Sequence, residues 1–194
     1  MERFSTLTAV AAPLDVPNVD TDQIIPARFL RYPRSAGYER FLFHDQGPDF
    51  VLRQPAYREA KILVVADNFG CGSSREGAVW AIKGAGVRAL VGPSFGDIFF
   101  ENCFKNGVLA VVLPREAAAD IRRQLHDRPG ALVTIDLGGQ AVTAPDGTVH
   151  RFEIDPYRKT MLEEGLDDIG LTERHEAAIA AYERRRREET PWLP

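Results

Sequence analysis

Hydrophobic runs alternate with helical patterns through the middle of the chain. Three short apolar runs are typical of buried strands, at residues 61–66, 87–91 and 108–113. Helices are predicted after each run, at residues 74–84, 97–106 and 115–127, the second ending at a favoured C-terminal glycine, Gly107. This βαβαβα order predicts an α/β fold with a small, mostly parallel sheet.

Shorter elements flank this pattern. A strand is predicted at residues 5–12, whereas residues 13–26, rich in Pro, Asp, Asn and Thr, predict an ordered loop. Weak periodicity and several prolines predict loops with short helical pieces at residues 32–60. Additional short strands separated by Gly-containing turns are predicted at residues 131–137, 141–143 and 149–154.

From Pro156 onward the pattern becomes helical again. One helix face is predicted to carry the residues Leu171, His175, Ala178, Ile179 and Tyr182. The charge run 184–187 suits the solvated C-terminal end of a helix, with a partner-binding face as the alternative. We therefore expect one domain over residues 1–194, with a helical tail at about 156–194.

Composition narrows the class of protein. The 194 residues are 44% apolar and 27% charged, as in an ordinary globular domain. The 24 basic and 28 acidic residues give a formal net charge of −4, which argues against a general nucleic-acid-binding surface. The chain has no apolar run long enough for a membrane span, and residues 1–6 lack the apolar core of a signal peptide. We expect a cytoplasmic protein.

The chain has only two cysteines, Cys71 and Cys103. Two thiols cannot form a disulfide framework, and iron–sulfur clusters generally need more thiolates than this. The four histidines have no zinc-type spacing. We therefore expect no metal or cluster to be held by this chain alone.

The segment Asn68-Phe-Gly-Cys-Gly-Ser-Ser-Arg-Glu76 follows the first buried strand and opens the first predicted helix. Ligands of α/β sheets bind at this end of the strands, and a helix N-terminus favours an anion. Gly70 and Gly72 allow close approach of backbone to a ligand. Ser73 and Glu76 also have the spacing of a capping box, which needs no function. Both interpretations stay open.

Arg75 favours the functional interpretation. A cation in the first helical turn opposes the helix dipole by about 0.3–1 kcal/mol, and a bound carboxylate or phosphate would explain it. A surface arginine is the alternative. Because residue 75 is not glycine and Gly-Lys-Ser/Thr is absent, nucleotide fingerprints fail. Near such positive potential, Ser73 could take a proton from a carbon next to a carboxylate.

Two further features carry candidate chemistry. Cys71 is interpreted either as a reactive thiolate or as a small packing residue, whereas Cys103 lies among phenylalanines and suits the core. Residues 18–26, Asn-Val-Asp-Thr-Asp-Gln-Ile-Ile-Pro, form either a structured turn or a polar contact with a partner through Asp20, Thr21 or Asp22.

Together with residues 93–99, 102–107 and 165–170, these two motifs resemble the small subunits of 3-isopropylmalate dehydratase, in the aconitase superfamily. The resemblance covers nearly the whole chain. It implies a swivelling β/β/α domain that packs against a large subunit carrying a 4Fe–4S cluster. It also implies a hydro-lyase that interconverts 2- and 3-isopropylmalate, small dicarboxylates, through isopropylmaleate in leucine biosynthesis.

The resemblance also implies residue roles. Ser73 would be the base, and Arg75 would bind a substrate carboxylate. Thr21 and Asp22 would face the partner's catalytic groups, and residues 27–34 would set substrate choice. The implied catalytic residues are Ser73, Arg75 and Asp22. The implied substrate-binding residues are Thr21, Gly72, Ser74, Arg28 and Arg31. The family commonly has histidine where Gly77 stands, which leaves the role of position 77 open.

Three alternatives remain at this point. The chain could be a related small subunit acting on homoaconitate, citraconate or dimethylmalate. It could be a non-catalytic module that binds a carboxylate or nucleotide. It could also be a redox-regulated interaction protein that uses Cys71.

Overall fold

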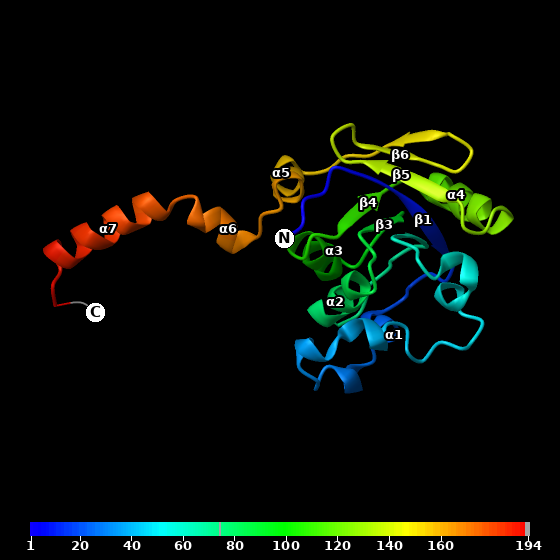
Figure 1. The fold of residues 1–194 in the computed structure, drawn as a ribbon, viewed down its shortest axis with the longest axis horizontal. Coiled ribbons are helices and arrows are strands. Elements are labelled where there is room, and N and C mark those ends of the chain that lie inside the picture. The colour runs from blue at the N-terminus through cyan, green and yellow to red at the C-terminus, as the bar shows by residue number, and fades with distance from the viewer. Residues whose placement is uncertain (74, 193–194) are drawn as a thin grey trace.

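The structure is a computed structural model that describes residues 1–73 and 75–192. Its centre is one seven-stranded sheet in the order β4-β3-β2-β1-β5-β6-β7 (Figure 1). The strands are β1 (Thr6–Leu14), β2 (Ile62–Val65), β3 (Ala89–Gly92), β4 (Leu109–Val112), β5 (Leu132–Asp136), β6 (Ala141–Thr143) and β7 (Val149–Arg151). The predicted α/β class is confirmed.

Strand β1 joins two differently built halves of the sheet. Its second half pairs parallel with β2, which continues through β3 to β4, also in parallel. Its first half pairs antiparallel with β5, and β6 and β7 extend that half. The additional short strands predicted from the sequence therefore belong to the same sheet as the parallel core.

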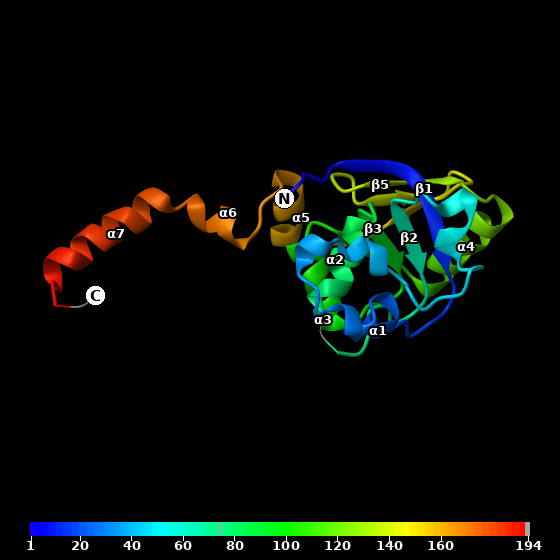
Figure 2. The same ribbon diagram turned by 60° about the horizontal axis from the view of Figure 1, so that its bottom comes forward.

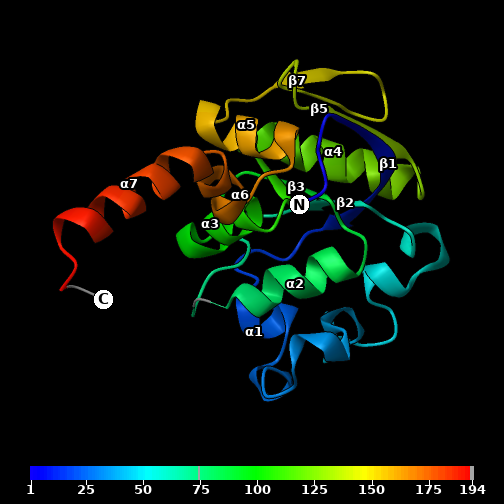
Figure 3. The same cartoon turned by 60° about the vertical axis from the view of Figure 1, so that its left-hand side comes forward.

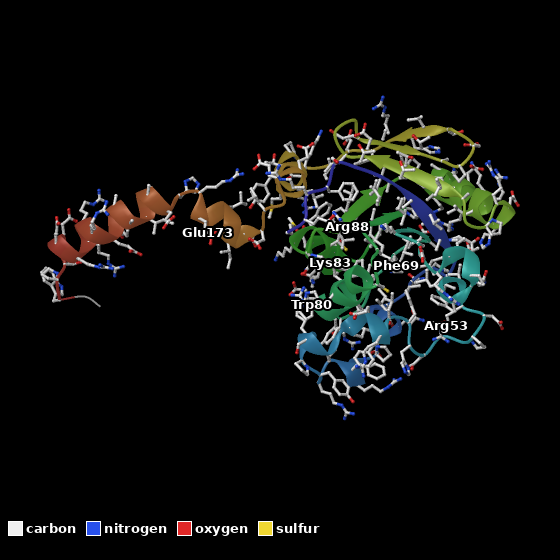
Figure 4. The ribbon with its side chains drawn as sticks, viewed as in Figure 1. Arg53, Phe69, Trp80, Lys83, Arg88 and Glu173 are labelled. Atoms are coloured by element: carbon white, nitrogen blue, oxygen red, sulfur yellow. The ribbon has the colours of Figure 1, made fainter. Side chains whose placement is uncertain are left out.

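Three helices cover the parallel half: α2 (Glu76–Gly84), α3 (Asp97–Lys105) and α4 (Arg115–Asp127). Figure 3 shows α4 and α2 on opposite sides of the parallel strands. Strands β2 and β3 are buried at every position, as expected for parallel strands covered on both faces. Phe69, labelled in Figure 4, has no exposed surface and lies in this interior.

The segment before β2 contains only short helical pieces. The predicted loop at residues 13–26 holds the end of β1 and a one-turn helix, α1 (Thr21–Ile24). Residues 27–57 carry the short helical pieces expected for this region, as 3₁₀ turns. They are η1 (Ala27–Phe29), η2 (Arg34–Ala36), η3 (Tyr38–Phe41), η4 (Val51–Arg53) and η5 (Pro55–Tyr57).

The C-terminal tail differs from its prediction. It forms α5 (Pro156–Glu164), α6 (Asp168–Glu173) and α7 (Glu176–Glu189), so the single apolar face across residues 171–182 is wrong. The break follows from tight i→i−3 bonds: His175 N–H donates to the Thr172 carbonyl (2.9 Å), and α7 starts afresh. Figures 1 and 2 show α6 and α7 extending away from the body. None of the helices in the described part of the chain is long and apolar enough to cross a membrane.

Candidate active site

Three loops that follow strands or precede helices are joined side by side. They are residues 18–21, 67–73 and 94–96, and backbone hydrogen bonds connect them like short parallel strands. The bonds run from Gly70 N–H to the Val19 carbonyl (2.7 Å), from Thr21 N–H to the Cys71 carbonyl (3.0 Å), and from Gly96 N–H to the Phe69 carbonyl (2.9 Å). The two sequence motifs are therefore brought together, with residues 94–96 as a third layer.

Glycine occurs at positions 70 and 72 of these loops for different structural reasons. Gly70 has φ of +75°, and a Cβ there would lie 2.2 Å from Cγ of Phe99. The packing of Phe99 therefore requires glycine at position 70, which also lines the cavity described below. Gly72, with φ of +84°, is exposed, and the nearest neighbour of a Cβ there would be Cβ of Asp20 at 3.4 Å. Gly72 therefore leaves the backbone of this loop accessible from solvent.

Two asparagines that the sequence reasoning missed shape the loops. Asn18 and Asn68 both have φ of 55°, a left-handed conformation that asparagine tolerates better than most residues. The Asn68 side-chain amide donates to Oδ1 of Asn18 (2.8 Å), and Asn68 N–H donates to Oγ of Ser94 (2.8 Å). Asparagine is the first residue of both motifs, and this shared position could have indicated the left-handed turns.

Thr21 and Ser73 are joined across the two motifs. The Thr21 hydroxyl, on a residue only 2% exposed, donates to the carbonyl oxygen of Ser73 (2.7 Å). Thr21 therefore holds the backbone of the Ser73 loop from inside, and its hydroxyl is already engaged. Ser73 itself is exposed.

The predicted capping box at Ser73 and Glu76 is wrong. Helix α2 begins at Glu76 and not at residue 74, with Arg75 as its N-cap and no capping hydrogen bond from a side chain. Glu76 instead accepts from the Asn106 side-chain amide (2.8 Å), which draws it away from the loop. A capping box does occur at α1, where Asp20 and Gln23 bond each other's backbone N–H groups.

Arg75 also differs from its prediction, because it precedes the first turn of α2 instead of lying within it. Its guanidinium, on a side chain 20% exposed, forms an ion pair with Oδ1 of Asp22. The same oxygen accepts from Ala27 N–H (2.7 Å). These hydrogen bonds, first from Ala27 and then from Arg75, hold the pKa of Asp22 below its ordinary value. The guanidinium of Arg75 is thus already paired with one carboxylate, that of Asp22.

A cavity of about 330 Å³ opens where the three loops meet. Its lining includes Thr21, Cys71, Gly72, Ser73 and Gly96. A larger cavity of about 760 Å³ lies beside Asp67 and Arg115, and neither Ser73 nor Arg75 lines it. Of the predicted site residues, Thr21, Gly72 and Ser73 line the smaller cavity, whereas Asp22 and Arg75 are not part of its lining.

The other predicted contact residues, Arg28 and Arg31, interact with other side chains. Arg28 pairs with both carboxylate oxygens of Asp45 (Nη1 to Oδ2, 2.8 Å), and the Arg31 guanidinium lies 5.4 Å from the centre of the Tyr32 ring. Neither arginine lines the cavity at Ser73. Ser74 lies outside the described residues. The structure therefore brings together Thr21, Asp22, Gly72, Ser73 and Arg75.

The two cysteines differ in environment. Cys71 is half-buried and lines the cavity, whereas Cys103 is fully buried, and burial raises the pKa of its thiol strongly. Among residues 1–73 and 75–192, no group of three or more His, Cys, Asp or Glu side chains could hold a metal ion.

Comparison with known families accounts for almost the whole chain in three parts. Residues 1–116 match the aconitase C-terminal domain, residues 119–156 match a model described as LeuD_N, and residues 168–194 match the C-terminal domain of the 3-isopropylmalate dehydratase small subunit.

Individual relatives align end to end. The 3-isopropylmalate dehydratase small subunit of Paramagnetospirillum magneticum is 52% identical over the full length of both chains. That of Leptospira interrogans is 48% identical over 100% of this chain and 98% of its own. A crystal structure of 3-isopropylmalate dehydratase from Methanocaldococcus jannaschii superposes with a TM-score of 0.71 at 25% identity, covering 91% of this chain and 99% of that one.

Proposed function

Because this chain belongs to the family of 3-isopropylmalate dehydratase small subunits, we propose that it provides one half of the active site of that hydro-lyase. With a large subunit it isomerises 2-isopropylmalate and 3-isopropylmalate through isopropylmaleate, in leucine biosynthesis. The observation that carries the proposal is the joining of Thr21 and Ser73 at one small cavity, with the Asp22–Arg75 ion pair linking the same two motifs, in a chain that aligns with its relatives from end to end.

Ser73 is proposed as the base. In its ionised form it accepts the proton from the carbon next to a substrate carboxylate, and the electrons of the broken C–H bond form the double bond of isopropylmaleate. Three features support this role: the Ser73 side chain is exposed at the cavity, its carbonyl is held by Thr21, and Gly72 leaves the approach open. Rehydration returns the proton from the same oxygen.

Arg75 is proposed to hold a substrate carboxylate. The ion pair with Asp22 supports this role, because it shows that a carboxylate can reach the Arg75 guanidinium and pair with it. A substrate carboxylate can take the place of Asp22 or share the guanidinium with it. Arg75 lies two residues from Ser73, so binding there holds the reacting carbon near the Ser73 hydroxyl.

The large subunit is proposed to carry the 4Fe–4S cluster. The two cysteines of this chain do not suit a cluster, because Cys103 is fully buried with a raised thiol pKa and lies apart from the cavity that Cys71 lines. When bound, a cluster supplies a Lewis acid for the departing hydroxyl. The exposed residues of loops 18–21 and 67–73, Asn18, Asn68, Gly72 and Ser73, form the surface proposed to meet it.

Reconstitution tests the proposal. The chain is combined with a 3-isopropylmalate dehydratase large subunit, and the absorbance of the carbon–carbon double bond is followed with 3-isopropylmalate, homoaconitate, citraconate and dimethylmalate. Citraconate is already unsaturated, so its hydration lowers the absorbance. We expect turnover of 3-isopropylmalate to exceed that of the other acids. Ser73→Ala should lower kcat by about 100-fold or more while assembly persists. Full activity of that variant would refute the base assignment, and tight substrate binding by the isolated chain would favour a non-catalytic module.

A further inference from the structure

Helix α2 carries two glycines on one face. Gly77 and Gly84 are two turns apart, so they point to the same side of the helix. Each glycine in a helix costs about 1 kcal/mol relative to alanine. Neither has the positive φ that requires glycine, so the reason must be what lies against them.

The segment after α1 lies against this face of α2, as Figure 3 shows. A Cβ on buried Gly77 would lie 2.7 Å from Cδ2 of Leu30 and 3.1 Å from Cε2 of Tyr38. A Cβ on exposed Gly84 would meet the flexible carboxylate of Glu39 at 2.7 Å. The two positions therefore differ: a side chain at 84 displaces a carboxylate in solvent, whereas one at 77 displaces a packed leucine.

Leu30 is half-buried, and its neighbours Tyr38 and Phe29 are held in place. The Tyr38 ring is 5% exposed, and its hydroxyl donates to the Tyr32 carbonyl (2.9 Å). Phe29 stacks on Phe41 with ring centres 4.2 Å apart. Residues 29–41 thus pack together around their aromatic side chains. A side chain at position 77 would displace these residues together.

Residues 29–41 are also tied to the proposed carboxylate site. Two residues before them, Ala27 donates its N–H to the Asp22 oxygen that pairs with Arg75. Gly77 lies two residues beyond Arg75, on the first turn of the same helix. Residues 27–34 are therefore placed relative to Arg75 by two contacts, one through Asp22 and one through Leu30 on Gly77.

We propose that Gly77 is a positioning residue for substrate selection. By having no side chain, it lets Leu30 dock against α2 and fixes how near residues 27–34 lie to Arg75, and hence which side chain a bound 2-hydroxy dicarboxylate can carry. This inference rests on the proposed function, because it assumes that Arg75 holds the substrate carboxylate.

The test compares Gly77→Ala with the control Gly84→Ala, which also adds one methyl group to α2 but places it against the exposed side chain of Glu39. In the enzyme reconstituted with its large subunit, the ratio of kcat/KM for 3-isopropylmalate to that for 3-methylmalate is measured. We expect Gly77→Ala to change this ratio at least about fivefold, mainly through KM, and Gly84→Ala to leave it within about twofold. Leu30→Ala should abolish the effect: the double variant should have the same ratio as Leu30→Ala alone.

A second readout needs no turnover. Trp80, labelled in Figure 4 where α2 meets this segment, has its ring centre 5.7 Å from that of Tyr38 and 4.4 Å from the Arg34 guanidinium. In a Trp192→Phe background, Trp80 is the remaining tryptophan. Gly77→Ala should shift its emission, Gly84→Ala should not, and Leu30→Ala should reverse the shift.

The two readouts separate the possible failures. An unchanged Trp80 emission in Gly77→Ala refutes the positioning role. A shifted emission with an unchanged substrate ratio refutes the selection role. If the wild-type reconstituted enzyme turns over neither acid, the proposed function has failed, and with it the selection role, while the emission still decides whether Gly77 places residues 27–34.

Discussion

The carboxylate of Asp22 and the guanidinium of Arg75 form an ion pair that joins the two motifs of the chain. Asp22 lies on α1, and Arg75 is the N-cap of α2. Because the same carboxylate oxygen also accepts from Ala27 N–H, this pair is the point where the Ser73 loop, α1 and the following segment meet. Its charge state therefore bears on stability.

We predict that Asp22→Asn removes a pH-dependent part of the stability. The pKa of Asp22 is lowered in the folded state, so its contribution is fully present above the unfolded value near 3.8 and is lost as pH falls through the lower folded value. The side chain is 55% exposed, so the contribution is small. Urea unfolding of both proteins should show their difference in unfolding free energy shrinking from pH about 6 to about 2. Parallel curves would contradict this role of the carboxylate.

Arg75→Lys should weaken substrate binding more than turnover. Lysine keeps the charge but cannot bind a carboxylate with two parallel hydrogen bonds. Steady-state kinetics of the reconstituted enzyme should show KM for 3-isopropylmalate raised about tenfold or more, with a smaller change in kcat. Arg115→Lys is the control, since Arg115 pairs with Asp67 beside the other cavity and is 70% exposed. An equal rise in KM for both variants would count against a specific role for Arg75.

The sequence predicted the repetitive part of the fold because its patterns are local. The buried runs at 61–66, 87–91 and 108–113 became β2, β3 and β4, and the glycine after α3 has a left-handed φ of +76°. By contrast, the joining of both sheet halves through β1 depends on partners more than 100 residues apart, such as Thr6 and Asp136. No local pattern encodes such pairing.

The candidate site was predicted only in part, because its local motifs can be recognised in the sequence but the distant partners of its residues cannot. The motifs at residues 18–26 and 68–76 do meet, yet the local spacing of Ser73 and Glu76 was misleading. Asn106, 30 residues away, takes the Glu76 carboxylate. Likewise, the engagement of Arg28 by Asp45 arises within a segment of weak periodicity, where sequence reasoning had no pattern to follow.

Gly70→Ala should destabilise the protein strongly. The new Cβ would lie 2.2 Å from Cγ of Phe99, whose ring packs edge-on against Phe69 with centres 5.6 Å apart, and the backbone has φ of +75°. Clash and backbone strain together predict a loss of roughly 2–4 kcal/mol in the free energy of unfolding. Gly147→Ala separates the two effects, because it shares a positive φ of +92° but has no atom within 4 Å of a Cβ. It should lose only about 1 kcal/mol. Equal losses would show that the Phe99 contact is unimportant.

The two thiols should react at very different rates in the native protein. Cys71 is half-buried at the cavity, while Cys103 is fully buried and its thiol pKa is raised. Iodoacetamide followed by peptide mass mapping should modify Cys71 first and Cys103 only after unfolding. A Cys71→Ser variant should show no fast modification. Alkylation that leaves assembly and activity unchanged would exclude redox regulation through Cys71, whereas blocked activity fits its place in the cavity wall.

The tail beyond Gly165 should add little to the stability of the body. Within residues 166–192, all described by the structure, α6 and α7 contain no buried residue. A lone helix of 14 residues is only marginally stable in water. A chain ending at Leu166 should therefore unfold with a free energy within about 0.5 kcal/mol of the full chain. Amide hydrogen exchange in the isolated full chain should be fast along α7 and slow along α2.

A variant that removes more of the chain provides the control for the tail. Ending the chain at Asp155 also removes α5, whose Met161 and Leu162 are buried, and the Leu162 carbonyl that accepts from Phe4 N–H (2.8 Å). Losing these two side chains from the core should cost several kcal/mol, about 2–5 for each. If ending at Leu166 were as costly, α6 and α7 would have to pack on the body in solution. Protection of α7 that appears only after the large subunit is added would instead show that the tail becomes ordered in the assembled enzyme.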